Sequence, residues 1–213
     1  MTDRIAPQPD DALIVVDMQN DFVRGGALAV PGGETIVPLV NRLIGAFAQS
    51  ALTQDWHPPG HASFASSQPG TNLFERIATP HGEQVLWPDH CVQGSDGAAL
   101  IAGLDVASPF LILRKGTKRA LDSYSAFLEA DRVTTTGLAA LLEARGVRRV
   151  FVCGLATDFC VAFTALDARA AGFATFVIED ACRAIDADDS LEAAWTHMAA
   201  AGVTRIASSA ILG

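Results

Sequence analysis

Hydrophobic positions along the chain follow two spacings, and these predict alternating strands and helices. A continuous apolar run over 12–16, which ends at Asp17, is typical of a strand buried on both faces of a parallel sheet. Further strands are predicted over a short segment that leads into Asp55 and over 110–113, 150–153, 174–178 and 203–206. Between these runs, the spacing changes to that of a helix.

Apolar residues recur at the 3.6-residue spacing of an amphipathic helix from Ile36 to Phe47. Further helices are predicted over 136–145 and over 157–171, the second with Gly172 just beyond its end. A last helix is expected to be capped by Asp189, with Glu192 in capping-box spacing, and to end at Gly202.

Strands that alternate with helices predict right-handed crossovers and one parallel sheet covered on both faces. We therefore expect an α/β fold of three layers, αβα, with a central, mostly parallel six-stranded sheet. Because 213 residues suit one compact domain and no linker or repeat is visible, we expect a single domain over 1–213.

One long region departs from this alternation. Residues 56–109 contain several prolines and little periodicity, yet they hold four of the five histidines and two of the three tryptophans. A connection of that length inside a compact domain is usually functional or disordered. Its aromatic and histidine content disfavours disorder, so we expect it to be functional.

Composition excludes several classes of protein. Half of the residues are hydrophobic and 18% are charged, which excludes an intrinsically disordered chain. A net charge of −9 disfavours nucleic acid and anionic membranes as partners. No signal peptide or membrane-spanning run is apparent, so we expect a cytoplasmic protein.

The four cysteines lie at 91, 153, 160 and 182 and form no CxxC pair. They are too sparse for a disulfide scaffold, and in a reducing compartment each is by default a small buried hydrophobic residue. Cys160 differs, because it falls in the first turn of a predicted helix that follows a strand. Helix N-termini favour thiolates, and a nearby lysine would lower the thiol pKa further. Position alone leaves the alternative of an inert core cysteine open.

Ligands of open parallel sheets bind at the carboxyl ends of the strands. Asp17, Asp55, Lys115, Asp158 and Cys160 all lie at or just after predicted strand ends. An acid, a base and a thiol at one edge indicate chemistry rather than packing. Taken singly, Asp17 could cap a turn and Lys115 could be a surface lysine, so the two gain weight only together with Cys160.

A metal site is a second hypothesis for the same edge. In an extended segment, Asp55 and His57 project on the same side, as two ligands of one metal must. His61, His81 and His90 in the following region are candidate further ligands, and His90 sits in the stiff context WPDHC. The plain alternative for each histidine is an exposed or hydrogen-bonded side chain. Phe22 and Trp87 are candidates for an aromatic pocket or for ordinary core.

At this point the chain resembles the isochorismatase-like cysteine hydrolase family and, within it, the metal-containing nicotinamidases. The resemblance covers nearly the whole chain, and its segments keep their order. DMQNDF and GLATDFC indicate the superfamily, while DWH together with WPDHC selects the metal-bearing amidases. The matching segments are VVDMQNDFVRGGALAV (15–30), QDWHPPGHASFAS (54–66), WPDHCVQGSDGAAL (87–100), RKG (114–116), DSYSAF (122–127) and GLATDFCVAFTALDA (154–168).

The resemblance implies a catalytic triad of Asp17, Lys115 and Cys160. It implies that the backbone N–H groups of Ala156 and Cys160 form an oxyanion hole, with a cis peptide bond entering Ala156. The reaction it implies converts nicotinamide and water to nicotinate and ammonia through a thioester, as in NAD salvage, and it extends to pyrazinamide.

The resemblance also implies one divalent metal ion, Zn, Fe or Mn, held by Asp55, His57 and His90. His61 matches a histidine that binds the metal in only some members of the family. The ring of the substrate would lie between Phe22 and Trp87, with Leu28 and Tyr124 as walls. The implied partner is this small molecule, and a homo-oligomer is left open.

Three rival hypotheses remain. A related amidase acting on N-carbamoylsarcosine or a ureido compound would use the same triad. A hydrolytic metal site could activate water itself, with Cys160 as a spectator. A flavodoxin-like binding module without turnover would leave the acid, lysine and thiol at the strand ends unexplained.

Overall fold

The structure is a computed structural model, and it describes residues 4–213. Six strands form one sheet in the order β5-β2-β1-β6-β7-β8, and every pairing is parallel. The prediction of a mostly parallel six-stranded sheet is therefore confirmed. The strands are β1 (Asp11–Val16), β2 (Ser50–Asp55), β5 (Leu111–Lys115), β6 (Arg149–Leu155), β7 (Ala174–Arg183) and β8 (Thr204–Ile206).

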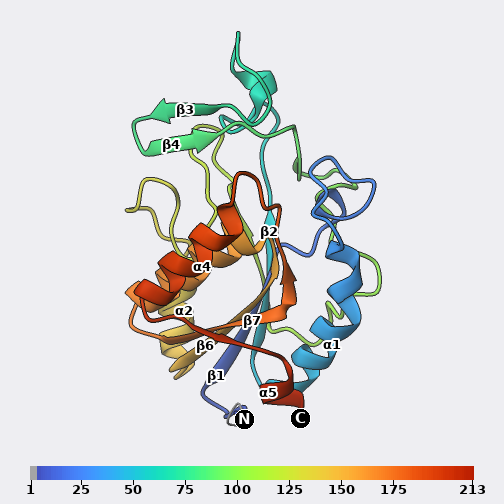
Figure 1. The fold of residues 1–213 in the computed structure, drawn as a ribbon, viewed down its shortest axis with the longest axis vertical. Helices are drawn as coiled ribbons and strands as arrows, with labels where there is room; N and C mark the ends of the chain where they lie inside the picture. The colour runs from blue at the N-terminus through green and yellow to red at the C-terminus, as the bar shows by residue number, and fades with distance from the viewer. Residues whose placement is uncertain (1–3) are drawn as a thin grey trace.

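Helices cover both faces of this sheet. Figure 1 shows α1 (Val37–Ala46) and α5 (Ser209–Leu212) on one side, and α2 (Leu138–Ala144) and α4 (Ser190–Ala200) on the other. The remaining helix, α3 (Ala162–Ala170), packs against α4 and β7. This arrangement is the three-layer αβα fold that the sequence predicts. Among residues 4–213, no helix has both the length and the apolar character needed to cross a bilayer.

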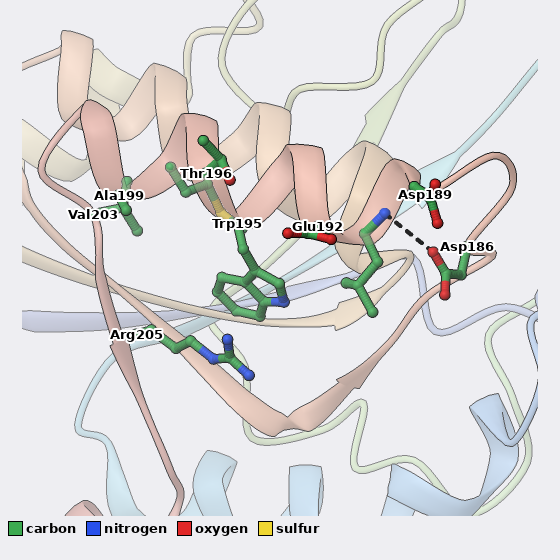
Figure 2. A pocket seen from close by; sticks show the side chains of 10 residues that line it. Asp186, Asp189, Glu192, Trp195, Thr196, Ala199, Val203 and Arg205 are labelled. Atoms are coloured by element: carbon green, nitrogen blue, oxygen red, sulfur yellow. Dashed lines mark hydrogen bonds between the residues drawn. The ribbon is translucent and has the colours of Figure 1, made fainter.

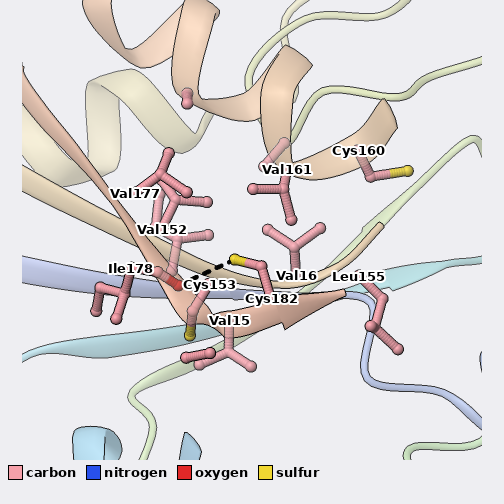
Figure 3. Packing of buried hydrophobic residues seen from close by; sticks show 14 of the residues in the cluster. Val15, Val16, Val152, Cys153, Leu155, Cys160, Val161, Val177, Ile178 and Cys182 are labelled. Carbon is pink, nitrogen blue, oxygen red and sulfur yellow. Dashed lines mark hydrogen bonds between the residues drawn. The ribbon is translucent and has the colours of Figure 1, made fainter. Parts of the chain in front are cut away.

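The core lies where the central strands meet the helices. All residues of β1 and β2 are buried, as expected for strands covered on both faces. Figure 3 shows Val16, Val152 and Val177 on one face of the sheet and Val15 on the other, each in the buried core. Each such side chain contributes roughly 1.5–3 kcal/mol by leaving water. This packing gives the carboxyl ends of the strands a rigid base.

The long region 56–109 contains a hairpin that the sequence analysis does not predict. It consists of β3 (Arg76–Thr79) and β4 (Gly82–Val85), paired antiparallel and lying beyond the sheet at the top of Figure 1. Its strands are mostly exposed, so no apolar alternation marks them in the sequence. A bridge between Phe64 and Trp87 and another between His57 and Val92 tie the region together.

The predicted start of the last long helix is partly wrong. Asp189 is the N-cap residue of α4, but its backbone is left-handed (φ 60°) and its side chain makes no capping hydrogen bond. Instead, Leu191 N donates to Asp186 Oδ1 at 3.3 Å, as Figure 2 shows. The pocket in that figure, about 580 Å³ between α4 and β8, is lined by none of the predicted site residues.

The predicted helix over 157–171 begins with a wider turn. Its first residues form η4 (Thr157–Val161), a π-helical turn, and α3 follows directly. Gly172 beyond α3 is left-handed (φ 97°), as predicted for that position. Short 3₁₀ turns η1 (Asn20–Phe22), η2 (Gly33–Ile36) and η3 (Ala65–Ser67) complete the described elements.

Candidate active site and metal centre

The carboxyl edge of the sheet brings Asp17, Lys115 and Cys160 together. Asp17 follows β1, Lys115 ends β5, and Cys160 lies in η4 after β6. Lys115 Nζ is 2.9 Å from Asp17 Oδ2 and 3.4 Å from Cys160 Sγ. All three are buried, Lys115 with 1% of its surface exposed, so it is not a surface lysine.

Lys115 is held by several acceptors at once. Besides Asp17, its ammonium group contacts Asp55 Oδ1 and donates to the carbonyl oxygen of Ser123 at 3.0 Å. Burial alone lowers the pKa of Lys115, but the nearby carboxylates of Asp17 and Asp55 outweigh burial and raise that pKa well above its usual value. Lys115 is therefore a permanent cation in the site.

Asp17 is oriented by a residue of the neighbouring strand. Thr53 Oγ1 donates to Asp17 Oδ1 at 2.6 Å and accepts from Asp17 N at 3.1 Å. Burial raises the pKa of Asp17, and the Lys115 cation opposes that rise. Asp17 Oδ2, 2.9 Å from Lys115 Nζ, accepts no well-directed hydrogen bond from the described residues. It is therefore a base with capacity to accept a proton.

The pKa of Cys160 differs from the sequence expectation. Burial raises the pKa of this thiol well above its usual value, and Lys115 lowers it while Asp17 and Asp55 raise it further. One oxygen from each carboxylate and the sulfur lie within 4.8 Å of one another. Burial, together with the two carboxylates, thus outweighs the Lys115 cation and favours the neutral form of the Cys160 thiol beside Asp17.

The backbone before Cys160 is held in an unusual turn. The Leu155–Ala156 peptide bond is cis, as the resemblance implies. The carbonyl oxygen of Ala156 accepts from the N–H groups of Phe159 and Val161, each at 3.1 Å. Asp158 turns away from the site, because its carboxylate accepts from the N–H groups of Ile185 and Asp186.

A second group, directly beside the first, has the donor set of a metal site. Asp55 Oδ2 lies 3.7 Å from His57 Nε2 and 3.8 Å from His90 Nε2, and all three residues are buried. These separations are too long for hydrogen bonds, but they suit atoms that share one ion at bonds of about 2.1 Å.

The tautomers of the two histidines fit a metal as well. His57 Nδ1 donates to the carbonyl oxygen of Gly116 at 3.0 Å, and His90 Nδ1 donates to that of Pro88 at 2.8 Å. A carbonyl oxygen can only accept, so each Nδ1 carries a hydrogen, and in the neutral imidazole each Nε2 then offers its lone pair on the side of Asp55. The residues present therefore fit a divalent ion.

His61 and His81 lie outside this group. His61 stacks on His57 with ring centroids 4.2 Å apart, and its nitrogens contact Ser63 Oγ at 2.7 Å and the Leu121 carbonyl oxygen at 3.3 Å. It forms a separate potential ligand group with His57 and Asp122. His81 is exposed at the turn of the β3–β4 hairpin.

Aromatic residues surround the two groups. The Phe22 ring lies 5.6 Å from that of His90, and Trp87 packs edge-on against Phe159 at 4.9 Å. Trp87 Nε1 donates to Tyr124 Oη at 2.9 Å. Leu28 is buried in the hydrophobic core that also contains Phe22 and Trp87.

Two residues that orient the site were not singled out from the sequence. Thr53 orients Asp17, and Gln19 brackets Asp55, accepting from its N–H and donating to its carbonyl oxygen at 2.8 Å each. The signal for Thr53 is a hydroxyl-bearing residue in a predicted strand, two positions before Asp55 and on the same face. For Gln19, the only signal in the sequence is its position two residues after Asp17.

Fold and site together define an α/β protein with a buried cysteine, acid and lysine beside a metal-ligand group. The chain belongs to the isochorismatase family, since the isochorismatase domain matches residues 11–210.

Individual relatives agree with this assignment. The chain is 55% identical to a nicotinamidase from Acinetobacter baylyi over 201 residues, which is 94% of each chain. Its structure is similar to that of an Acinetobacter baumanii nicotinamidase/pyrazinamidase, with a TM-score of 0.94, 52% identity and coverage of 95% and 98% of the two chains. It is also similar to the Pyrococcus horikoshii pyrazinamidase solved in complex with zinc, with a TM-score of 0.76, 36% identity and coverage of 93% and 99%.

Proposed function

We propose that this protein is a nicotinamidase, which hydrolyses nicotinamide to nicotinate and ammonia with Cys160 as the nucleophile. The observation that carries the proposal is the contact of Lys115 with both Asp17 and Cys160, directly beside the ligand group of Asp55. The relatives described above are nicotinamidases and pyrazinamidases, which supports a pyridine or pyrazine carboxamide as substrate.

The first half-reaction transfers the acyl group to sulfur. Asp17 takes the proton of the Cys160 thiol as the sulfur attacks the amide carbon. The raised pKa of Asp17 makes its carboxylate a stronger base than an ordinary one, which favours this transfer, whereas the raised pKa of the Cys160 thiol opposes it. Lys115 stabilises the negative charge while it moves from carboxylate to sulfur.

The carbonyl oxygen becomes negative in the tetrahedral intermediate. The N–H groups of Ala156 and Cys160 are proposed to donate to it, a contribution of roughly 3–4 kcal/mol for each donor. Asp17 then returns its proton to the departing ammonia, which leaves a nicotinoyl thioester on Cys160. In the second half-reaction Asp17 removes a proton from water as the water oxygen attacks the thioester carbon. The C–S bond then breaks, Asp17 returns the proton to the Cys160 sulfur, and nicotinate is released.

Asp55, His57 and His90 are proposed to hold one divalent ion, Zn, Fe or Mn. The bound ion would supply a Lewis acid that orients the ring nitrogen of the substrate. The zinc complex of the Pyrococcus relative supports a divalent metal in this protein as well. His61, whose nitrogens already contact Ser63 and Leu121, is proposed to support His57 from behind by stacking.

Aromatic residues are proposed to bind the substrate ring. Phe22 and Trp87 would lie on its two faces, and Leu28 and Tyr124 would close the sides. A pocket built this way accepts a pyrazine ring as readily as a pyridine ring, because both are flat and of similar size, so we propose that pyrazinamide is also deamidated.

The enzyme is proposed to act in the cytoplasm. All four cysteines are free thiols in the structure, as is usual in a reducing compartment.

Ammonia release from a panel of amides tests the proposed function. We expect turnover of nicotinamide, and little or none of N-carbamoylsarcosine or ureidoacrylate. Cys160→Ala should abolish turnover, whereas Cys153→Ala, which changes a buried cysteine inside β6, should retain it. Preference for a ureido compound would contradict the proposed substrate. Full activity of Cys160→Ala would instead favour a metal-activated water as the nucleophile.

A further inference from the structure

The β3–β4 hairpin places one polar side chain against the predicted substrate pocket. Its strands are otherwise exposed or half-buried, but Gln84 on β4 is buried. Burying a primary amide is unfavourable unless its donors are hydrogen-bonded. The partners of Gln84 therefore indicate what the residue does.

Gln84 Nε2 has three acceptors outside its own strand pairing. It lies 2.8 Å from the Val85 carbonyl oxygen, 2.9 Å from Asp122 Oδ2 and 3.2 Å from Tyr124 Oη. The first two are acceptors only, so the NH₂ side of the amide must face them. The NH₂ group has two hydrogens for these three oxygens, so the hydrogen directed at Tyr124 Oη, the most distant of the three, is shared. An amide nitrogen does not accept, so Tyr124 Oη is the acceptor in this contact.

Tyr124 Oη accepts a second hydrogen bond, from the indole of Trp87. Trp87 Nε1, which can only donate, lies 2.9 Å from it. Tyr124 thus receives N–H groups from Gln84 on the hairpin and from Trp87 at the pocket. The indole of Trp87 is also fixed by edge-on packing against Phe159, the residue before Cys160.

We propose that Gln84 is a positioning residue of the substrate pocket, which acts through Tyr124 to hold the Trp87 indole against the substrate ring. Asp122 accepts from the Gln84 amide and fixes its orientation, and Tyr124 Oη links that amide to the indole N–H of Trp87. The inference rests on the proposed function, in which Trp87 contacts the ring. The hairpin thereby contributes to substrate affinity although none of its residues belongs to the triad or to the metal-ligand group.

Steady-state kinetics of Gln84→Met test this role. The variant loses the hydrogen bond between Gln84 and Tyr124, which should raise KM for nicotinamide about fivefold to tenfold. The value of kcat should stay within about twofold, because the triad is untouched. Gln84→Leu, which removes the donor without adding a charge beside Asp122, should raise KM similarly. Glu83→Gln, an exposed neighbour on the same strand, is the matched control and should leave KM unchanged. An unchanged KM in both Gln84 variants would overturn the proposal.

A double-mutant cycle separates positioning from a merely structural role. Trp87→Phe removes the indole N–H, so adding Gln84→Met to it should change KM less than about twofold. If Gln84→Met has the same effect with and without Trp87→Phe, Gln84 does not act through Trp87.

Indole ¹H–¹⁵N spectra give a readout that does not depend on turnover. In Gln84→Met the Nε1–H resonance of Trp87, assigned with Trp87→Phe, should move, while those of Trp56 and Trp195 should not. Unmoved Trp87 resonances would contradict the positioning role even if nicotinamide is the substrate. The two results can also separate. If the wild-type protein releases no ammonia from nicotinamide while Gln84→Met still shifts the Trp87 resonance, the proposed function is overturned and the Gln84–Tyr124–Trp87 link stays intact.

Discussion

Lys115 is the residue on which both halves of the site depend. Its ammonium group contacts Asp17, Asp55 and Cys160 in a buried setting, so these three groups share its positive charge. Asp17 and Asp55 would otherwise repel each other at close range. A single cation therefore keeps the base of the proposed mechanism next to the anchor of the metal-ligand group.

Lys115→Met removes that charge while keeping much of the side-chain volume. We expect kcat for nicotinamide to fall by about 10²–10⁴, since the base and the nucleophile lose the group that balances them. We also expect the free energy of unfolding to fall by about 3–5 kcal/mol, because two buried carboxylates lose the ammonium group that they share. Kinetics and urea unfolding, with the exposed Lys118→Met as control, measure both. An unchanged kcat would show that Lys115 is not part of the mechanism.

At the scale of elements, the strand ends and the turns that follow them place the ligands. β5 ends at Lys115, and the next residue, Gly116, is left-handed (φ 63°) and passes directly under His57. A Cβ at Gly116 would lie 2.5 Å from His57 Cε1 and 2.7 Å from Nδ1. Only glycine therefore lets the β5 turn approach the His57 ring and accept its hydrogen bond.

Gly116→Ala should consequently displace His57. We expect the affinity for zinc to fall by about 10-fold to 100-fold, the usual cost of losing a hydrogen bond that orients a ligand. Titration of the metal-free protein with zinc in competition with a chelating dye measures this. Gly146→Ala is the matched control, because Gly146 is also left-handed but has no atom within 4 Å of the added Cβ. Equal zinc affinity in both variants would mean that Gly116 does not position His57.

The elements also show which parts of the fold could be read from the sequence. The apolar run over 12–16 predicts β1, because strands covered on both faces of a parallel sheet are usually continuous apolar runs. The β3–β4 hairpin escapes prediction because its exposed strands bury little besides Gln84. Asp189 was expected to cap α4, but Asp186, three residues earlier, supplies the carboxylate, since loop geometry decides which side chain reaches the helix.

Some features of the candidate site could likewise be predicted from the sequence, and others could not. Strand ends locate Asp17, Lys115 and Cys160, because parallel strands bring their carboxyl ends to one edge. The supporting contacts of Thr53 and Gln19 depend on pairing across strands, which one sequence does not reveal. The raised pKa of the Cys160 thiol could not be read either, because it results from burial and from two carboxylates that come from distant segments.

At the scale of the whole molecule, the buried thiols couple stability to pH. Burial raises the pKa of Cys182 from 9.0 to about 12, and its Sγ donates to the Ile178 carbonyl oxygen at 3.2 Å (Figure 3). In the unfolded chain the same thiol ionises near pH 9. Between pH 9 and 12 the folded state therefore holds a proton that the unfolded state has lost, and the free energy of unfolding falls as pH rises.

Urea unfolding from pH 8 to 11 measures this coupling. For Cys182 the expected loss is about 1.4 kcal/mol for each pH unit above 9, and none is expected below it. Cys182→Ala should shift the whole curve but reduce its slope above pH 9 by that amount. Parallel curves for the wild-type protein and the variant would show that Cys182 ionises equally in both states.

The central claim is that the amide is attacked by the sulfur of Cys160, and mass spectrometry of the acid-quenched enzyme during turnover of nicotinamide tests it most directly. We predict a nicotinoyl group on the peptide that contains Cys160, absent without substrate and absent in Cys160→Ala. Steady ammonia release by an enzyme that carries no acyl group at any quench time, together with full activity of Cys160→Ala, would contradict the account.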